Sequence, residues 1–301
     1  MESPVICSTC LSWQMKYPCG VCRHPNAEGL TTSNEMVFQD AGKLCPKNAL
    51  KYRLERLKDT KSIIEELSKE CQKNGIKGAV IGISGGKDST VVAKLMVECL
   101  GKENVLGVLM PNGEQSDIED SVRVVELLGI EAITVNIHSS FDNLVDSVTR
   151  ELQYLGSDLT KASRINIAPR IRMTTLYAIA QSMGSGWRVV GTTNKSEDYI
   201  GWLTKWGDGG VDFEPIIDLT VTEVVQLGLN LGLPEDLVCK TPIDGLAEGS
   251  DEERIGVPYK MIDKYIYEGT TENALLDEKI EKLYFYSNHK RTLIPRYVLK
   301  Y

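Results

Sequence analysis

Residues 79–90 read Ala79-Val80-Ile81-Gly82-Ile83-Ser84-Gly85-Gly86-Lys87-Asp88-Ser89-Thr90. The first five residues are mostly apolar and predict a buried strand, whereas apolar residues recur at helical spacing after the loop, up to Leu100. The two adjacent glycines allow a sharp turn in which backbone amides approach an anion without a Cβ clash. A strand, a glycine turn and a helix in this order predict a phosphate-binding loop at the carboxyl end of the strand.

Asp88 makes this loop unusual. A carboxylate repels phosphate unless a cation lies between them, so its presence indicates a complex of Mg²⁺ with a nucleotide. The loop also departs from the Walker A pattern, because Ile81 replaces its first glycine and Asp88 replaces its serine or threonine. The alternative is a structural strand-to-helix turn, but such a turn does not require two glycines, a lysine and two serines together. We therefore expect nucleotide binding here, but not a γ-phosphate kinase loop.

The rest of the chain alternates short apolar runs with helical patterns, which predicts an α/β fold with a parallel sheet flanked by helices. An amphipathic helix over residues 49–74 should precede the loop, and polar helices should follow residue 251. In such a sheet, ligands bind at the carboxyl ends of the strands. The further buried strands are predicted at 105–110, 132–137 and 187–191, and the further helices at 89–100, 118–128, 171–183 and 222–231.

Length and composition predict one main domain, residues 47–301, after a short Cys-rich extension, residues 1–46. The chain has 301 residues, 42% of them hydrophobic, and a formal net charge of -8. This acidic charge argues against a nucleic-acid partner, which requires a basic surface. No apolar run approaches the roughly 18 residues that span a membrane, and the N-terminus lacks a secretory signal, so we expect a cytoplasmic protein with no membrane partner.

Four of the eight cysteines lie in the first 22 residues. In the cytoplasm, cysteines are thiols or metal ligands before they are disulfides. Cys7, Cys10, Cys19 and Cys22 have the paired spacing of a tetrahedral Zn²⁺ site, with His24 and Cys45 as further candidates. The alternative is a reactive tail that binds no metal. A structural zinc site is thus one of two open interpretations of the extension.

The Ser-Gly-Gly-x-Asp-Ser loop resembles that of the N-type ATP pyrophosphatases, which cleave ATP between its α and β phosphates and adenylate a carbonyl or carboxylate. This resemblance implies a Rossmann-like adenine nucleotide alpha hydrolase fold. Three later segments, at residues 166–177, 191–216 and 288–295, are similar in order and spacing to those of the NAD synthetases. The first segment reads Asn-Ile-Ala-Pro-Arg-Ile-Arg-Met and is followed by Leu-Tyr. The second reads Gly-Thr-Thr-Asn-Lys-Ser-Glu and is followed by Gly-Trp-Leu-Thr-Lys-Trp-Gly-Asp-Gly. The third reads Asn-His-Lys-Arg and is followed by Pro. The resemblance covers roughly residues 50–298.

The resemblance implies a role for each matching residue. Asp88 and Glu197 would be ligands of Mg²⁺. The candidate catalytic residues are Asp88, Lys205 and Asp212, and Asp212 could position or deprotonate ammonium. ATP as co-substrate would be contacted by Gly82, Ile83, Ser84, Gly85, Gly86, Lys87, Asp88, Ser89 and Thr192. Deamido-NAD would be contacted by Arg172, Lys205, Asp212, His289 and Lys290.

The implied reaction has two steps. The carboxylate of deamido-NAD attacks the α-phosphorus of ATP to give an acyl-adenylate, and ammonia then displaces AMP. We expect free ammonia or ammonia from a partner, because the roughly 46 residues before the leading helix are too few for a glutaminase domain. The resemblance also implies a homodimer with the second nucleotide site across its interface.

Two positions depart from the family pattern. Val221 and Ile243 stand where the family often has a lysine and a serine that contact ATP. A non-catalytic nucleotide-binding regulator would tolerate both changes. A tRNA thiolase is the other rival, because such enzymes pair the same loop with an N-terminal Cys₄ zinc module; the acidic charge and residues 166–215 favour a dinucleotide ligase instead.

Overall fold

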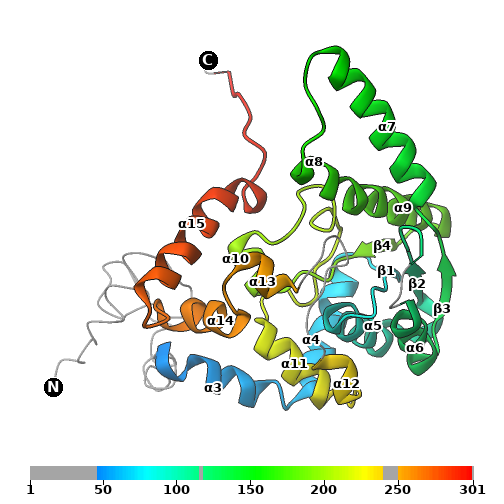
Figure 1. The fold of residues 1–301 in the computed structure, drawn as a ribbon. Helices are drawn as coiled ribbons and strands as arrows, with labels where there is room; N and C mark the ends of the chain where they lie inside the picture. Colours follow the sequence, from blue (N-terminus) through cyan, green and yellow to red (C-terminus); the bar gives the residue numbers. More distant parts are fainter. Residues whose placement is uncertain (1–45, 115–117, 240–249, 300–301) are drawn as a thin grey trace.

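The computed structural model describes residues 46–114, 118–239 and 250–299, and within this part of the chain four strands form one sheet. The sheet order is β3-β2-β1-β4, and all three pairings are parallel (Figure 1). The strands are β1 (Gly78–Gly82), β2 (Val105–Leu109), β3 (Glu131–Thr134) and β4 (Trp187–Val190). The prediction of an α/β fold with a parallel sheet is therefore confirmed.

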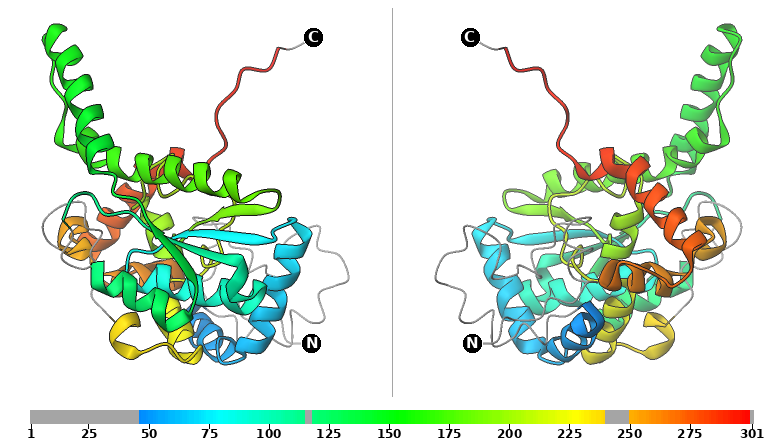
Figure 2. Two further views of the ribbon diagram at one scale, coloured as in Figure 1. Left: turned by 90° about the vertical axis from the view of Figure 1, so that its right-hand side faces the viewer. Right: turned by 90° about the vertical axis from the view of Figure 1, so that its left-hand side faces the viewer.

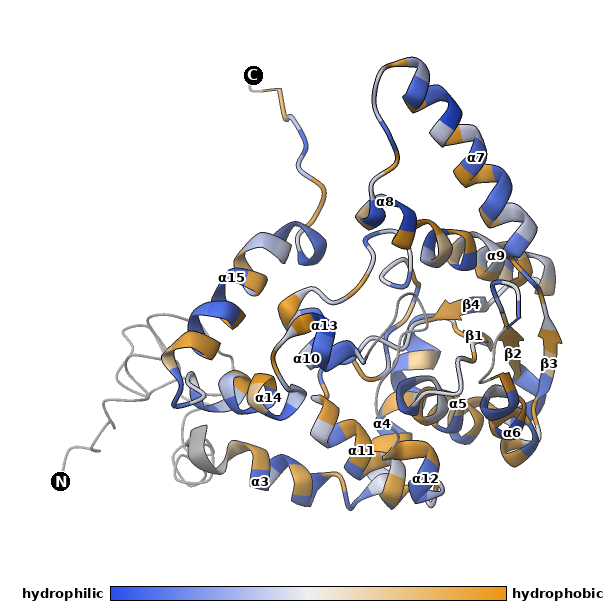
Figure 3. Cartoon of the chain, in the orientation of Figure 1, coloured by the Kyte–Doolittle hydropathy of each residue, from blue (hydrophilic) through white to orange (hydrophobic). Residues whose placement is uncertain are grey.

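The two central strands are apolar because both faces of the sheet are covered. Every residue of β2 is buried, as are the first four residues of β1, and the apolar colouring of the strands in Figure 3 follows this burial. Ile81 of β1 is paired with Gly107 of β2 and with Val190 of β4. The carboxyl ends of β1 and β4 consequently lie side by side, which brings two of the predicted motifs together.

The prediction of a buried strand at 132–137 is wrong in its burial and its end. β3 stops at Thr134, and none of its four residues is buried. It lies at the edge of the sheet and pairs only with β2, so Ile133 remains 42% exposed. The apolar run in the sequence reflects strand propensity rather than a central position in the sheet.

Helices cover the sheet on both faces, as Figure 2 shows from two sides. On one face α5 (Lys87–Leu100) packs on β1 and β2, with α6 (Ile118–Leu128) on β2. On the other face α9 (Ile167–Met183) packs on β4 and β1. One hydrophobic cluster lies on each side of the sheet, so the fold has three layers.

The single leading helix predicted for residues 49–74 is two helices, α3 (Pro46–Arg56) and α4 (Thr60–Lys73). The break lies at Asp59, whose side chain accepts a hydrogen bond from the Ser62 amide and caps α4. α4 packs on α5, whereas α3 packs on helices of the C-terminal half. Helical periodicity continues across the break, so the sequence pattern alone did not reveal it.

The remaining helices form an arm and a second helical layer. α7 (His138–Tyr154) projects from the body and returns through α8 (Lys161–Ile165) (Figures 1 and 2). α11 (Val221–Asn230) and α12 (Glu235–Val238) pack against α5. The other helices surround a third cluster: α10 (Lys195–Ile200), α13 (Asp251–Ile255), α14 (Tyr259–Glu268) and α15 (Ala274–Arg291). In the described part of the chain, no helix combines the length and apolarity that crossing a membrane requires.

Candidate active site

The loop after β1 is held by hydrogen bonds between near neighbours in sequence. The Ser89 hydroxyl lies 3.1 Å from that of Ser84 and donates to the Gly86 carbonyl at 3.1 Å. Gly86 is the N-cap of α5, so the amides of the helix start point toward the loop. Gly85 has φ +76°, and a Cβ there would lie 2.8 Å from Asp120 Cβ. The turn and its packing thus account for Gly85, whereas Gly86 has an extended backbone at φ -80° as the N-cap of α5.

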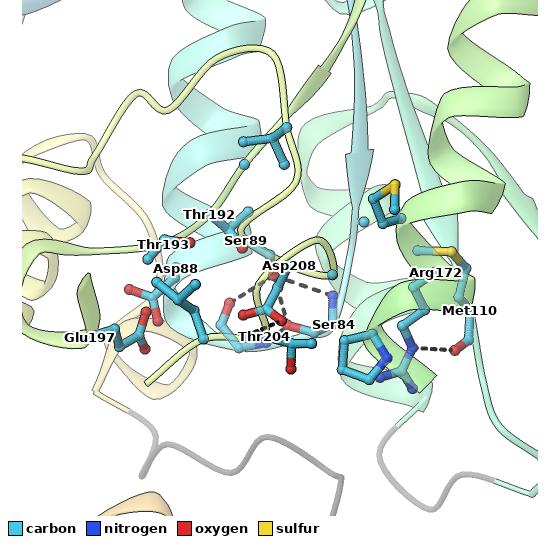
Figure 4. A pocket seen from close by; sticks show the side chains of 18 of the residues that line it. Ser84, Asp88, Ser89, Met110, Arg172, Thr192, Thr193, Glu197, Thr204 and Asp208 are labelled. Carbon is cyan, nitrogen blue, oxygen red and sulfur yellow. Dashed lines mark hydrogen bonds between the residues drawn. The ribbon is translucent and has the colours of Figure 1, made fainter. Parts of the chain in front are cut away.

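A cavity of about 620 Å³ opens at the carboxyl ends of β1 and β4. It gathers eleven residues of the predicted site, from the loop and from three other parts of the chain. Arg172 lies at one end of the cavity, and the carboxylates of Asp88 and Glu197 lie side by side at the other (Figure 4). The eleven residues are Gly82, Ile83, Ser84, Gly86, Lys87, Asp88, Ser89, Arg172, Thr192, Glu197 and Lys290.

Asn194 connects the two carboxylates. Its fully buried side chain donates from Nδ2 to Asp88 Oδ1 at 3.1 Å and accepts the Glu197 amide at 3.0 Å. Glu197 accepts the Asn194 amide in return, at 3.2 Å, and this reciprocal pair is the capping box of α10. The same residues that start the helix therefore fix both predicted metal ligands. The sequence motif contained Asn194, but it was not identified as a functional residue, although Asn three residues before Glu is a capping signal.

Lys87 balances this acidic end. Its Nζ lies 2.8 Å from Asp88 Oδ2, and the residue is only 4% exposed. Burial alone would lower the pKa of Lys87, but the Asp88 and Glu197 carboxylates outweigh it and raise the pKa. Burial raises the pKa of Glu197 well above its usual range, and the negative charge of Asp88 raises it further. When both of these half-buried carboxylates are ionised beside one ammonium, they leave an excess of negative charge that a cation would neutralise.

These residues fit Mg²⁺. The ion prefers oxygen ligands and typically uses one or two carboxylates together with phosphate oxygens and water. The cavity supplies two carboxylates beside an anion-binding loop, and no group of three or more His, Cys, Asp or Glu side chains suited to a metal occurs among the described residues. The site thus matches a cation shared with a nucleotide better than a closed protein cage.

Asp208, rather than Asp212, lines the cavity. Asp208 accepts the Thr204 amide at 2.9 Å and is accessible from the cavity, while surrounding protein atoms desolvate its carboxyl and raise its pKa. Asp212 lies outside the cavity, where it accepts hydrogen bonds from the Tyr177 hydroxyl and the Val189 amide, each at 3.0 Å. The segment at residues 191–216 contains both acids close together in the sequence, so the sequence alone did not show which of them faces the substrate.

The predicted cations divide into two groups. Arg172 lines the cavity and donates from Nε to the Met110 carbonyl at 3.2 Å. Lys290 lines it as well, and its Nζ donates to the carbonyls of Gly201 at 2.7 Å and Leu203 at 2.6 Å, which fixes the segment after α10. Lys205 lies outside the cavity lining and donates to the His289 carbonyl at 2.7 Å. The structure therefore does not bring Lys205, Asp212 and His289 into the cavity of this single chain, nor Gly85 into its lining.

The cavity and its surroundings also contain residues that were not among the predicted site residues, although the acidic run at 251–253 fits the family pattern. Asp251 and Arg254 of α13 both line it, and the Arg254 guanidinium lies 4.9 Å from the centre of the Trp202 ring. Glu214 accepts the Thr193 amide at 3.3 Å behind the end of β4, and burial raises its pKa to about 8. These residues lie in charge runs or loops with no spacing signal, so only their tertiary position identifies them.

Several predicted residues lie outside the part of the chain that the structure describes. Cys7, Cys10, Cys19 and Cys22 lie outside the described residues, as do His24, Cys45 and Ile243. Val221 is the first residue of α11 and packs against the third hydrophobic cluster. The zinc hypothesis and the domain boundary at residue 46 therefore remain predictions.

Comparisons with known proteins agree with this site. The NAD synthase family model matches residues 59–296. The NH(3)-dependent NAD(+) synthetase of Pyrococcus horikoshii is 40% identical over 252 residues, which are 79% of this chain and 95% of that relative. That of Methanococcoides burtonii is 45% identical over 210 residues, 68% of this chain and 76% of the relative.

A solved structure is also similar to the chain. The NMN synthetase from Francisella tularensis has a TM-score of 0.72 and 31% identity, covering 82% of this chain and 99% of that one. The family model spans the phosphate loop, the acidic pair and the cations of the cavity. The chain therefore belongs to the NAD synthase family.

Proposed function

We propose that this chain is an amide ligase that converts deamido-NAD to NAD, with ATP and ammonia as co-substrates and an acyl-adenylate as intermediate. The observation that carries the proposal is the composition of one cavity. An anion-binding loop, two joined carboxylates and two cations from separate motifs line it together. Membership of the NAD synthase family supports the same reaction and does not favour tRNA thiolation.

In the first step, different residues of the cavity bind the phosphates of ATP, the anionic substrate and the metal. The start of α5 and the serine hydroxyls of the loop bind the phosphates of ATP, and Arg172 and Lys290 attract the anionic substrate. Asp88 and Glu197 would hold Mg²⁺, which would supply neutralisation of the charge on pyrophosphate. The substrate carboxylate then attacks the α-phosphorus, and the bond between that phosphorus and the bridging oxygen of pyrophosphate breaks. Catalysis rests on positioning and charge neutralisation.

In the second step ammonia attacks the activated carbonyl, and AMP leaves with the bonding electron pair. We assign the positioning of ammonium to Asp208, because this acid faces the cavity and Asp212 does not. The raised pKa of Asp208 suits a carboxylate that accepts the proton which ammonium must lose before it attacks. Lys205, Asp212 and His289 remain proposed contacts for a part of the substrate that extends beyond the cavity.

The second candidate substrate is a mononucleotide, nicotinate mononucleotide. The Francisella tularensis structure with a TM-score of 0.72 is named an NMN synthetase, and among the described residues three of the five expected to contact deamido-NAD, Lys205, Asp212 and His289, do not line the cavity. The chemistry at the carboxylate would be the same for both substrates. The choice between them therefore concerns residues outside the reacting centre.

The test is an assay of the purified chain with ATP, Mg²⁺ and ammonium, with deamido-NAD in one reaction and nicotinate mononucleotide in the other. We expect NAD, AMP and pyrophosphate in equal amounts from the dinucleotide. Preferential turnover of the mononucleotide would replace deamido-NAD with the second candidate. No AMP release with either substrate would overturn the proposed ligase activity.

We also propose a homodimer, with the nucleotide site completed across its interface. The uncovered apolar residues on β3 and on the α7 arm support it: Ile133 is 42% exposed and Leu144 is 44% exposed. Sedimentation velocity of the purified chain would test it, and a monomer at micromolar concentration would contradict it.

We also propose that the protein is located in the cytoplasm.

A further inference from the structure

A buried tyrosine hydroxyl without a hydrogen-bond partner lies beside the acidic end of the cavity. Tyr259 is the first residue of α14 and is 2% exposed. Its hydroxyl is shielded from solvent and forms no hydrogen bond within the described part of the chain. Native structures rarely leave such a group unsatisfied, and an ion or an ordered water is a usual explanation.

The surroundings of this hydroxyl indicate what it could contact. Lys87 Nζ lies 5.7 Å from the centre of the Tyr259 ring, and the same Nζ is bonded to Asp88. Burial raises the pKa of Tyr259, and the nearby carboxylates of Glu197, Asp251 and Asp88 raise it further. A tyrosine with an ordinary pKa of about 10 is already protonated at neutral pH, so this hydroxyl is a hydrogen-bond donor beside the Lys87–Asp88 pair.

Two other tyrosines on α14 show what an ordinary buried hydroxyl does in this helix. Tyr265 is 1% exposed and donates to Glu281 Oε1 at 2.8 Å, and Tyr267 is 8% exposed and donates to Glu223 Oε2 at 2.7 Å. Each has a carboxylate partner already in place, away from the cavity. Tyr259 differs from both because its hydroxyl has no such partner and its ring lies beside Lys87, which pairs with the proposed metal ligand Asp88.

We propose that Tyr259 is a positioning residue for the divalent cation held by Asp88 and Glu197. Its hydroxyl donates to the Glu197 carboxylate and accepts a hydrogen bond from a water molecule on the cation. This inference rests on the proposed function, because it requires Mg²⁺ to bind with ATP at this end of the cavity. Groups that orient metal ligands in this way strengthen metal binding without touching the ion.

The arrangement also connects the proposed cation site to the C-terminal half of the chain. Glu252 Oε1 accepts the Tyr259 amide at 2.7 Å, which ties α13 to the start of α14. Asp251, one residue before Glu252, is 5% exposed and lines the cavity. Occupation of the cation site would therefore stabilise the α13–α14 junction, and formation of that junction would in turn favour cation binding.

The experiment compares Tyr259→Phe with Tyr265→Phe in the full chain. The probe is Mn²⁺ in the presence of a non-hydrolysable α,β-methylene analogue of ATP, and binding is followed by electron paramagnetic resonance. We expect Tyr259→Phe to weaken Mn²⁺ binding roughly 10- to 100-fold. The Mg²⁺ concentration for half-maximal activity should rise similarly, with kcat at saturating Mg²⁺ little changed.

The melting temperature of the metal-free protein separates positioning from structure. Tyr259→Phe removes a hydroxyl that has no partner, so its melting temperature should match or exceed that of the wild type, whereas Tyr265→Phe should melt earlier and bind Mn²⁺ normally. Wild-type Mn²⁺ affinity in Tyr259→Phe would overturn the inference alone, as would an equal loss of affinity in both variants. A wild-type protein that binds the ATP analogue without any dependence on Mn²⁺ would overturn the metal-dependent function as well.

Discussion

The phosphate loop and the α13–α14 segment bound the same cavity, but they are built in opposite ways. Hydrogen bonds among Ser84, Gly86 and Ser89 hold the loop, so its shape follows from a few adjacent residues. Asp251, Arg254 and Tyr259 of the other segment approach the loop only because α14 packs against α10 and α11. A local motif can be recognised in the sequence, whereas a cavity surface formed by distant elements can be recognised only in the folded structure.

The difference has an energetic counterpart. The loop side depends on backbone amides and short polar side chains, which need little beyond the strand and helix that flank them. The opposite side depends on buried polar contacts between helices, such as those of Asp263 of α14 with Ser196 of α10 and Thr222 of α11. Substitutions on the loop side should therefore affect chemistry first, and those on the opposite side should affect stability and metal binding together.

The largest effect is expected for Asp88→Asn on the loop side. Loss of this carboxylate removes a proposed Mg²⁺ ligand and should lower the rate of pyrophosphate release by at least about 100-fold. The matched control is Asp236→Asn, since Asp236 is an exposed acid that pairs with Arg123 away from the cavity. A rate within tenfold of wild type in Asp88→Asn, with normal activity in the control, would contradict a metal role for Asp88.

The next effect is expected for Asp263→Ala on the opposite side. Asp263 is 2% exposed and accepts hydrogen bonds from the Ser196 hydroxyl and from the Thr222 amide and hydroxyl. Its loss leaves buried donors unsatisfied and should lower the free energy of unfolding by about 2 to 4 kcal/mol in urea titrations. Asp218→Ala should cost less than about 1 kcal/mol, because the Asp218 side chain is 69% exposed. Equal losses of the free energy of unfolding in Asp263→Ala and Asp218→Ala would contradict this expectation.

Asn194→Ala should give a smaller effect, on Mn²⁺ affinity, because Asn194 connects Asp88 on the loop side to Glu197 of α10. The substitution removes the hydrogen bond to Asp88 and the cap of α10, so Mn²⁺ affinity should fall by roughly 10-fold or more. Loss of a helix cap alone costs about 1 kcal/mol. Asn273→Ala removes the cap of α15, far from the metal ligands, and should lower stability with metal affinity intact. Identical metal affinities in the two variants would show that Asn194 acts only as a cap.

Glu214→Gln should give the smallest effect, seen as a change of pH dependence. Because the pKa of Glu214 is raised from 4.5 to about 8, the folded state keeps a proton that the unfolded state releases above pH 4.5. Wild-type stability should therefore fall as pH rises from about 4.5 to about 8. Between pH 6 and pH 7 the wild type should lose about 1 kcal/mol relative to Glu214→Gln in urea titrations. Parallel pH profiles would show that Glu214 is ionised in the folded protein.

The α/β class, the anion-binding loop and the motifs that contain the cations and carboxylates could all be predicted from the sequence. These follow from period, glycine placement and residue type within short windows, so they needed no knowledge of distant contacts. The same patterns led to a single leading helix and a buried third strand, because periodicity reports neither a cap at Asp59 nor a position at the sheet edge.

Which residues of each motif face the cavity depended on the packing of elements that are distant in the sequence. It placed Asp208 inside and Asp212 outside, joined Asp88 to Glu197 through Asn194, and brought the Tyr259 ring to 5.7 Å from Lys87 Nζ. The physical reason is that orientation toward a cavity depends on how separate helices pack, and burial and desolvation arise only when those elements meet. The loop at residues 84–89 predicted a nucleotide-binding site, whereas the proposed binding of the metal and of the substrate carboxylate depends on residues far from the loop in sequence.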